Sequence, residues 1–220
     1  MLKEWCDDLL SLGDDVWGAY AYAKEPLRGR LSREDYQEFY RKAAACGREE
    51  AQKLMERYGS GDCEKLAAGL GITIERLPMP SGMGLITFAC YYEPDRIELY
   101  EDNAREVQSL LEAAELNDRL GNTSVEDMLL AHELFHVVQS REKTLYINEK
   151  HIRLWKLGPI LRDSRLVSLE EVAAMEFART LLNMDYSPYV YDVLMLLPRD
   201  PEQAQRLYQK LMRLKEELDG

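Results

Sequence analysis

The sequence has no long hydrophobic segment. Its densest apolar run, Val193–Leu197, has five residues, whereas a helix that spans a bilayer needs about 20. The first residues also lack the basic stretch followed by an apolar stretch that is typical of a secretory signal. We therefore expect a cytoplasmic protein without a membrane partner.

Basic residues are too few for a protein whose main partner is nucleic acid. The 220 residues include 28 Lys and Arg against 40 Asp and Glu, a net charge of −12. Residues 61–123 alone hold five basic and 12 acidic side chains, a net −7. Such a surface repels a phosphate backbone, so we expect no nucleic-acid partner. The acidic middle third is typical of a solvated surface, and a preference for cationic partners is the alternative interpretation.

Cysteine is scarce and never paired at short spacing. The four residues, Cys6, Cys46, Cys63 and Cys90, form no CxxC motif and have no histidine near them in sequence. This pattern gives no support to a cysteine-based zinc site. We expect free thiols in a reducing compartment.

The chain divides into two parts by its apolar pattern. Residues 1–60 are predicted to form an N-terminal helical extension, because one apolar stripe runs from Trp5 to Tyr20 and a second helix starts at Ser32. Gly59-Ser-Gly61 ends this part. Residues 61–220 form the second predicted domain.

The second part predicts an α+β fold that is mostly helical. Alternating side chains predict strands over 72–77, 85–92 and 96–100, with a loop at Pro78–Gly82 and a turn at Glu93–Asp95. We interpret these strands as a small antiparallel sheet that precedes the longer helices. The predicted helices cover residues 62–71, about 103–119, 124–141, 148–156, 168–184 and 201–218.

One motif indicates chemistry: His132-Glu133-Leu134-Phe135-His136, an HExxH sequence. Residues four apart lie on one face of a helix, so both imidazoles can bind one zinc ion. Glu133 lies beside that face, where it can act as the general base on a water molecule at the metal. Two histidines satisfied by hydrogen bonds in a core are the alternative.

A catalytic zinc site needs a third protein ligand. The metzincin motif HExxHxxGxxH is excluded, because Gln139 and Glu142 occupy its glycine and histidine positions. His151 is a possible ligand or transition-state donor, and Tyr146 is another candidate for stabilising an oxyanion. Both are candidates by sequence proximity alone.

A glutamate from the predicted helix 168–184 is the better candidate for the third ligand. At about 100° per residue, Glu171 lies in the middle of an apolar arc, and Glu176 lies on what we interpret as the solvent face. We predict Glu171 as the ligand, with Glu170 as its competitor. The sequence Ser168-x-x-Glu171 is also a capping box, in which Glu171 would bind the Ser168 amide instead.

The order of these segments resembles the ImmA/IrrE family of zinc-peptidase-like proteins. The resemblance covers about residues 62–184 and rests on "EKLAAGLGI", "TIERL", "GLITFACYY", "RIELY", "LLAHELFHVVQ" and "EEVAAMEFARTLL". It implies a zincin-like fold of the gluzincin type in an intracellular metallopeptidase, often one that acts on regulatory proteins. The chain departs from the family at Phe135, Ala173 and Met175.

The sequence thus predicts a zinc-dependent peptidase with a peptide or protein substrate, which adds as a strand to the edge of the small sheet. His132, His136 and Glu171 are the predicted metal ligands and Glu133 the predicted catalytic base. A catalytically silent zincin, used as a metal-stabilised binding or regulatory module, is the first alternative. A helical interaction protein without metal is the second.

Overall fold

The structure is a computed structural model that describes residues 2–78, 87–157 and 160–220, with backbone alone at 155–157 and 160–161. The fold is mostly helical and of the α+β class, as the sequence predicts.

The described helices are α1 (Leu2–Leu10), α2 (Asp14–Lys24), the 3-10 helix η1 (Arg28–Arg30), α3 (Arg33–Tyr58), α4 (Cys63–Gly69), α5 (Glu101–Ala113), α6 (Val125–Arg141), α7 (Tyr146–Glu149), α8 (Val167–Leu181), α9 (Val190–Leu194) and α10 (Pro201–Asp219). The described strands are β1 (Thr73–Leu77), β2 (Ala89–Tyr92), β3 (Arg96–Tyr100), β4 (His151–Leu157) and β5 (Ile160–Arg165).

The N-terminal helices follow their local signals. The Ser32 side chain accepts a hydrogen bond from the Asp35 amide at 3.0 Å, which confirms the predicted start of α3. Gly59 ends α3 in the left-handed conformation, with φ of 64°. The apolar stripe from Trp5 to Tyr20 is divided between α1 and α2, because the chain turns out of the helix before Asp14.

The small sheet is mixed, so the predicted antiparallel sheet is wrong in part. Its strand order is β1-β3-β2. Strands β2 and β3 are antiparallel around the turn at Glu93–Asp95, as predicted, but β1 runs parallel to β3. Alternation of side chains predicts a strand without specifying its neighbour or direction. Residues 79–86, which include most of the loop 78–82 and the start of the predicted strand 85–92, lie outside the described residues.

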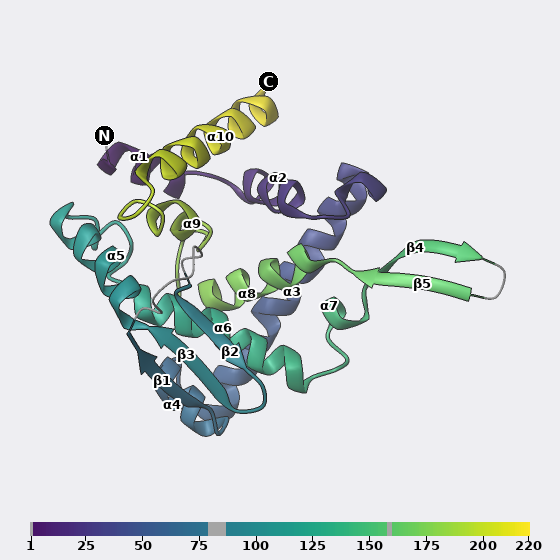
Figure 1. Ribbon diagram of the computed structural model, residues 1–220, viewed down its shortest axis with the longest axis horizontal. Coiled ribbons are helices and arrows are strands. Elements are labelled where there is room, and N and C mark those ends of the chain that lie inside the picture. The colour runs from purple at the N-terminus through teal and green to yellow at the C-terminus, as the bar shows by residue number, and fades with distance from the viewer. Residues whose placement is uncertain (1, 79–86, 158–159) are drawn as a thin grey trace.

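Three helices form the centre of the molecule (Figure 1). Helix α8 packs against α3 on one side and α6 on the other, and α6 in turn packs against β2 and β3. Gly47 of α3 makes this approach possible, because a Cβ atom there would lie 2.0 Å from the Ala173 carbonyl oxygen. Residues 1–60 and 61–220 contribute to one hydrophobic core. The boundary at residue 60 stays a prediction.

The predicted helix 148–156 is wrong. Helix α7 ends at Glu149, and β4 and β5 then form an antiparallel hairpin that projects from the body of the molecule (Figure 1). The alternating residues from His151 onward are the sequence signal for a strand that the helical interpretation overlooks. The predicted helix 103–119 is shorter than expected and ends at Ala113.

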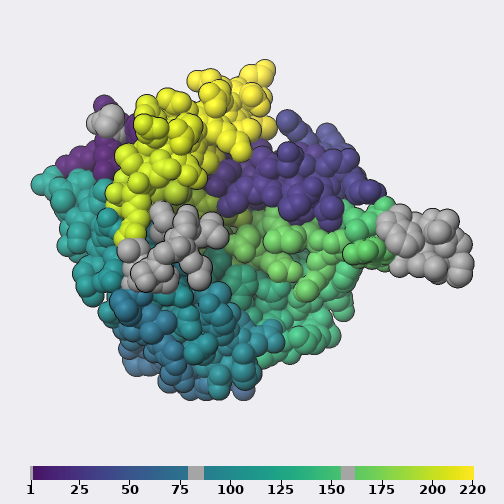
Figure 2. All heavy atoms as spheres, in the orientation of Figure 1, coloured from purple at the N-terminus to yellow at the C-terminus, as the bar shows by residue number. Residues whose placement is uncertain are grey.

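The C-terminal helix α10 covers the N-terminal helices. Figure 2 shows it beside α1 and α2 on one face of the molecule. The rings of Trp5 and Tyr208 stack at 4.5 Å between centroids, which joins α10 to α1. Among the described segments, none of the helices combines the length and the apolar character needed to cross a membrane.

Candidate metal centre

Helix α6 positions the two histidines. It begins as predicted, with the Ser124 side chain accepting a hydrogen bond from the Asp127 amide at 3.0 Å. Most of its surface is buried, and Phe135 packs fully inside the core. His132 and His136 point in the same direction, so their Nε2 atoms lie 3.2 Å apart.

Glu171 joins the histidines from α8. Its Oε2 atom lies 3.5 Å from His132 Nε2, and one ligand atom from each of the three residues lies within 4.8 Å of the others. Tetrahedral zinc with bonds of about 2.0–2.2 Å separates its ligand atoms by about 3.3–3.6 Å. The donor set and the two separations of 3.2 and 3.5 Å therefore suit zinc. The Glu171 side chain is 42% exposed, so solvent reaches the cluster from its side.

The two glutamates that compete for the role of third ligand have different contacts. Glu170 lies 3.5 Å from the Arg165 guanidinium and does not belong to the cluster of His132, His136 and Glu171 in the described part of the chain. The capping box is wrong, because the Ser168 amide donates to Glu25 Oε2 at 3.0 Å. The structure thus brings Glu171, and not Glu170, to the histidines.

Glu176 is also misplaced by the sequence interpretation, which put it on the solvent face. Its side chain is only 13% exposed, since it lies between Arg48 of α3 at 2.8 Å and Arg179 at 3.7 Å. Burial raises its pKa, and the two guanidinium groups oppose that shift. Angles on an isolated helix cannot show that α3 covers this face.

Glu133 lies between α6 and the sheet. Its Oε2 atom accepts a hydrogen bond from the Tyr91 amide of β2 at 2.8 Å. The Oε1 atom has no hydrogen-bond partner among the residues that the structure describes. One oxygen therefore fixes the carboxylate, and the other remains for a water molecule or substrate.

His136 has a second hydrogen bond that the sequence analysis missed. Its Nδ1 atom lies 3.0 Å from the side-chain oxygen of Gln139, three residues later on α6. This contact favours a proton on Nδ1 and leaves the Nε2 lone pair for a metal. The i, i+3 spacing of His136 and Gln139 was the available signal.

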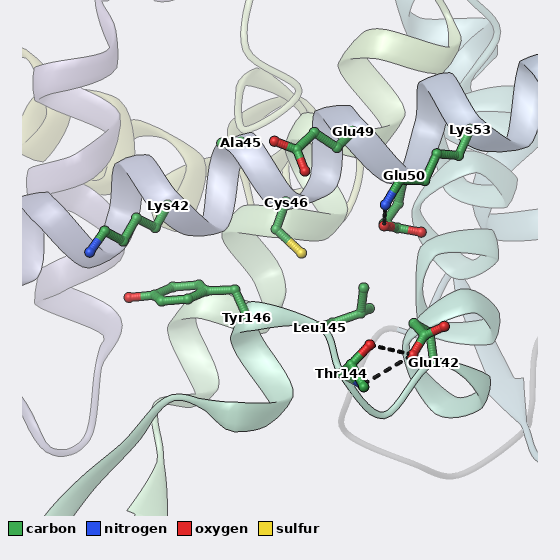
Figure 3. Close-up of a pocket in the computed structure, with 10 residues that line it drawn as sticks. All are labelled: Lys42, Ala45, Cys46, Glu49, Glu50, Lys53, Glu142, Thr144, Leu145 and Tyr146. Atoms are coloured by element: carbon green, nitrogen blue, oxygen red, sulfur yellow. Dashed lines mark hydrogen bonds and ion pairs between the residues drawn. The ribbon is translucent and has the colours of Figure 1, made fainter.

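The other two sequence candidates lie elsewhere. His151 is exposed on β4, where its Nδ1 atom contacts the Glu149 carbonyl at 2.8 Å. Tyr146 lines a cavity of about 450 Å³ between α3 and residues 142–146, together with Cys46 (Figure 3). Its hydroxyl is buried and has no hydrogen-bond partner in the described structure. Among the described residues, neither belongs to the candidate cluster of His132, His136 and Glu171.

No protein family, curated protein or solved structure matches this chain. The function is therefore inferred from the chemistry of the cluster itself.

Proposed function

We propose that this chain is a zinc-dependent peptidase of the HExxH…Glu type, as its resemblance to the ImmA/IrrE family implies. The observation that supports this most directly is the convergence of His132, His136 and Glu171, with separations of 3.2 and 3.5 Å that suit tetrahedral zinc. Three protein ligands leave a fourth position, which is the arrangement of catalytic rather than structural zinc sites.

Zinc at this position would supply a Lewis acid that polarises a carbonyl group and makes a neighbouring water molecule more acidic. Glu133 accepts the proton from that water. It follows His132 directly in the sequence, and its Oε1 atom has no hydrogen-bond partner among the described residues. The Tyr91 amide holds the other oxygen and so keeps the base in place. Gln139 orients the His136 ring for metal binding.

The substrate is a peptide or protein that binds along β2. Among the described strands, β2 lies at an edge of the sheet, and it contacts α6. The Phe88 carbonyl accepts a hydrogen bond from the Tyr100 amide, so the backbone groups of Phe88 face β3. Because this direction alternates along a strand, the backbone groups of Ala89 and Tyr91 face away from β3. The Tyr91 amide on that side already donates to Glu133, so a substrate strand would pair with the other outward backbone groups of β2 and pass beside the catalytic base.

A cytoplasmic location is part of the proposal. All four cysteines are free in the structure, and Cys6, Cys46 and Cys63 are buried. Free thiols are typical of a reducing compartment.

The decisive experiment compares the wild type with Glu133→Gln. We expect both proteins to bind about one zinc per chain, measured by elemental analysis. Cleavage of a peptide library, followed by mass spectrometry, should be about 10²–10⁴ slower in the variant, since the base is lost but the ligands remain. Glu202→Gln, an exposed change on α10, is the control and should cleave like the wild type.

Three outcomes separate the alternatives. Equal cleavage by wild type and Glu133→Gln would contradict the mechanism. Zinc binding without cleavage of any peptide would favour a silent, metal-stabilised binding module. Absence of zinc, with folding unchanged by a chelator, would favour a helical interaction protein.

A further inference from the structure

Side-chain contacts continue outward from His136 beyond Gln139. The Gln139 amide nitrogen lies 3.5 Å from Asn148 Oδ1. The Asn148 amide nitrogen donates to two carbonyl groups at the end of α6, those of Gln139 at 3.0 Å and Glu142 at 2.8 Å. Asn148 is therefore fixed to the end of the histidine helix, where its oxygen supports Gln139.

Arg165 lies at the outer end of this set of contacts. Its Nη1 atom donates to Asn148 Oδ1 at 3.3 Å and also lies 3.5 Å from Glu170 Oε1. One guanidinium group thus contacts both helices of the metal centre: α6 through Asn148, and α8 directly. It holds Glu170, the neighbour of the ligand Glu171, at a position outside the described cluster.

Arg165 is also the last residue of β5 and pairs with His151 at the base of the hairpin. The hairpin extends away from the body (Figure 1). Beyond its base it contacts the body through Arg30, whose Nη1 atom donates to the Leu154 carbonyl at 2.6 Å. A two-stranded hairpin is marginally stable by itself, so the position of Arg165 depends on the state of the hairpin.

We propose that Arg165 is a positioning residue for the metal centre, which links the hairpin to metal affinity; this inference rests on the proposed function. Through Asn148 and Gln139 it limits rotation of the His136 ring. Through its ion pair it keeps the Glu170 carboxylate away from the metal. Because linkage is reciprocal, metal binding in turn stabilises the hairpin.

The first test measures zinc affinity by competition with a chromophoric chelator, and the visible spectrum of the cobalt-substituted protein. Arg165→Gln should bind zinc about tenfold more weakly, the usual effect of losing a group behind a ligand. Its cobalt spectrum should also change, which a general loss of stability would not cause. Arg162→Gln, an exposed arginine on the same strand, is the matched control and should behave like the wild type.

The second variant pair isolates the role of Glu170. If Glu170 competes for the metal once Arg165 is gone, Arg165→Gln/Glu170→Gln should recover part of the wild-type cobalt spectrum. Glu170→Gln alone should leave the spectrum unchanged. A double variant with the same spectrum as Arg165→Gln would overturn the part of the proposal that concerns Glu170.

The reciprocal effect is measured on the wild type, so it does not depend on a variant that folds. Zinc should slow hydrogen exchange of the β4 and β5 amides as well as those of α6. Two results would overturn the proposed link between the hairpin and the metal centre but leave the proposed function intact. One is hydrogen exchange in the hairpin that zinc does not affect, and the other is a zinc affinity of Arg165→Gln equal to that of the wild type. A wild-type protein that binds no zinc would overturn the proposed function together with it.

Discussion

The two helices of the candidate metal centre, α6 and α8, begin in different ways. Helix α6 starts at a residue that caps it locally, since Ser124 accepts from the Asp127 amide three residues later. Helix α8 has no side-chain cap from the residue that precedes it, Leu166. The start of the histidine helix α6 therefore depends on residues close to it in sequence. The start of α8, which carries Glu171, depends on a residue far away in sequence.

That distant residue is Glu25, which is fully buried. Its Oε2 atom accepts from the amide and the hydroxyl of Ser168, at 3.0 and 2.7 Å, and its Oε1 atom accepts from the Leu27 amide at 2.9 Å. The Tyr36 hydroxyl donates to Ser168 Oγ at 2.6 Å. A carboxylate is favoured at a helix N-terminus, where amides are unpaired and the helix dipole is positive. The N-terminal segment thus supplies the cap for the helix that carries Glu171.

The largest expected effect concerns α6. His132→Ala/His136→Ala should lower zinc content from about one per chain to about zero, because both imidazole ligands come from this helix. Elemental analysis after dialysis measures it. His151→Ala is the control, since His151 lies outside the cluster, and should retain zinc. Unchanged zinc content in the double variant would show that α6 does not supply the metal ligands.

The contribution of α8 is the next largest. Glu171→Gln should weaken zinc binding by more than the ~10–100-fold that follows loss of a group behind a ligand, whereas Glu170→Gln should leave it near the wild-type value. Competition with a chelator gives both affinities. The reverse order would show that the assignment of the third ligand is wrong.

The packing of α3 on α8 is tested at Gly47. Alanine there would place its Cβ atom 2.0 Å from the Ala173 carbonyl oxygen, so the two helices must separate. We expect Gly47→Ala to lower the free energy of unfolding by about 3 kcal/mol or more. Gly29→Ala, where nothing lies within 4 Å of the new atom, should change it by less than about 0.5 kcal/mol. Denaturant unfolding measures both, and equal effects would show that the helices adapt freely.

The smallest expected effects come from removing the N-terminal caps of α8 and α6, and these two effects can be compared directly. Glu25→Ala should cost about 3 kcal/mol of unfolding free energy, because it leaves buried donors at Ser168 and Leu27 without an acceptor. Ser124→Ala should cost about 1 kcal/mol, the usual effect of losing a local cap. Zinc affinity should also fall in Glu25→Ala, since α8 carries Glu171. If the serine change costs more, the distant cap is not the stronger of the two.

Features that depend on neighbours within about one helical turn could be predicted from the amino-acid sequence. The start of α3 at Ser32, the start of α6 at Ser124, the end of α3 at Gly59 and the common face of His132 and His136 are all as predicted. Each depends on an interaction between residues at most four apart or on the backbone freedom of one glycine. No knowledge of the remaining chain is needed for them.

Contacts between residues far apart in the sequence could not be predicted in this way, because they depend on the complete fold. Three features differ from the expectations: the parallel pairing of β1 with β3, the antiparallel pairing of β4 with β5, and the burial of Glu176 against α3. Sequence patterns show which residues seek burial or alternate, but they do not specify the partner. Glu171 lies beside the histidines, as predicted, but the residues that hold α8 and Glu170 in place, Glu25 and Arg165, are brought there by the fold alone.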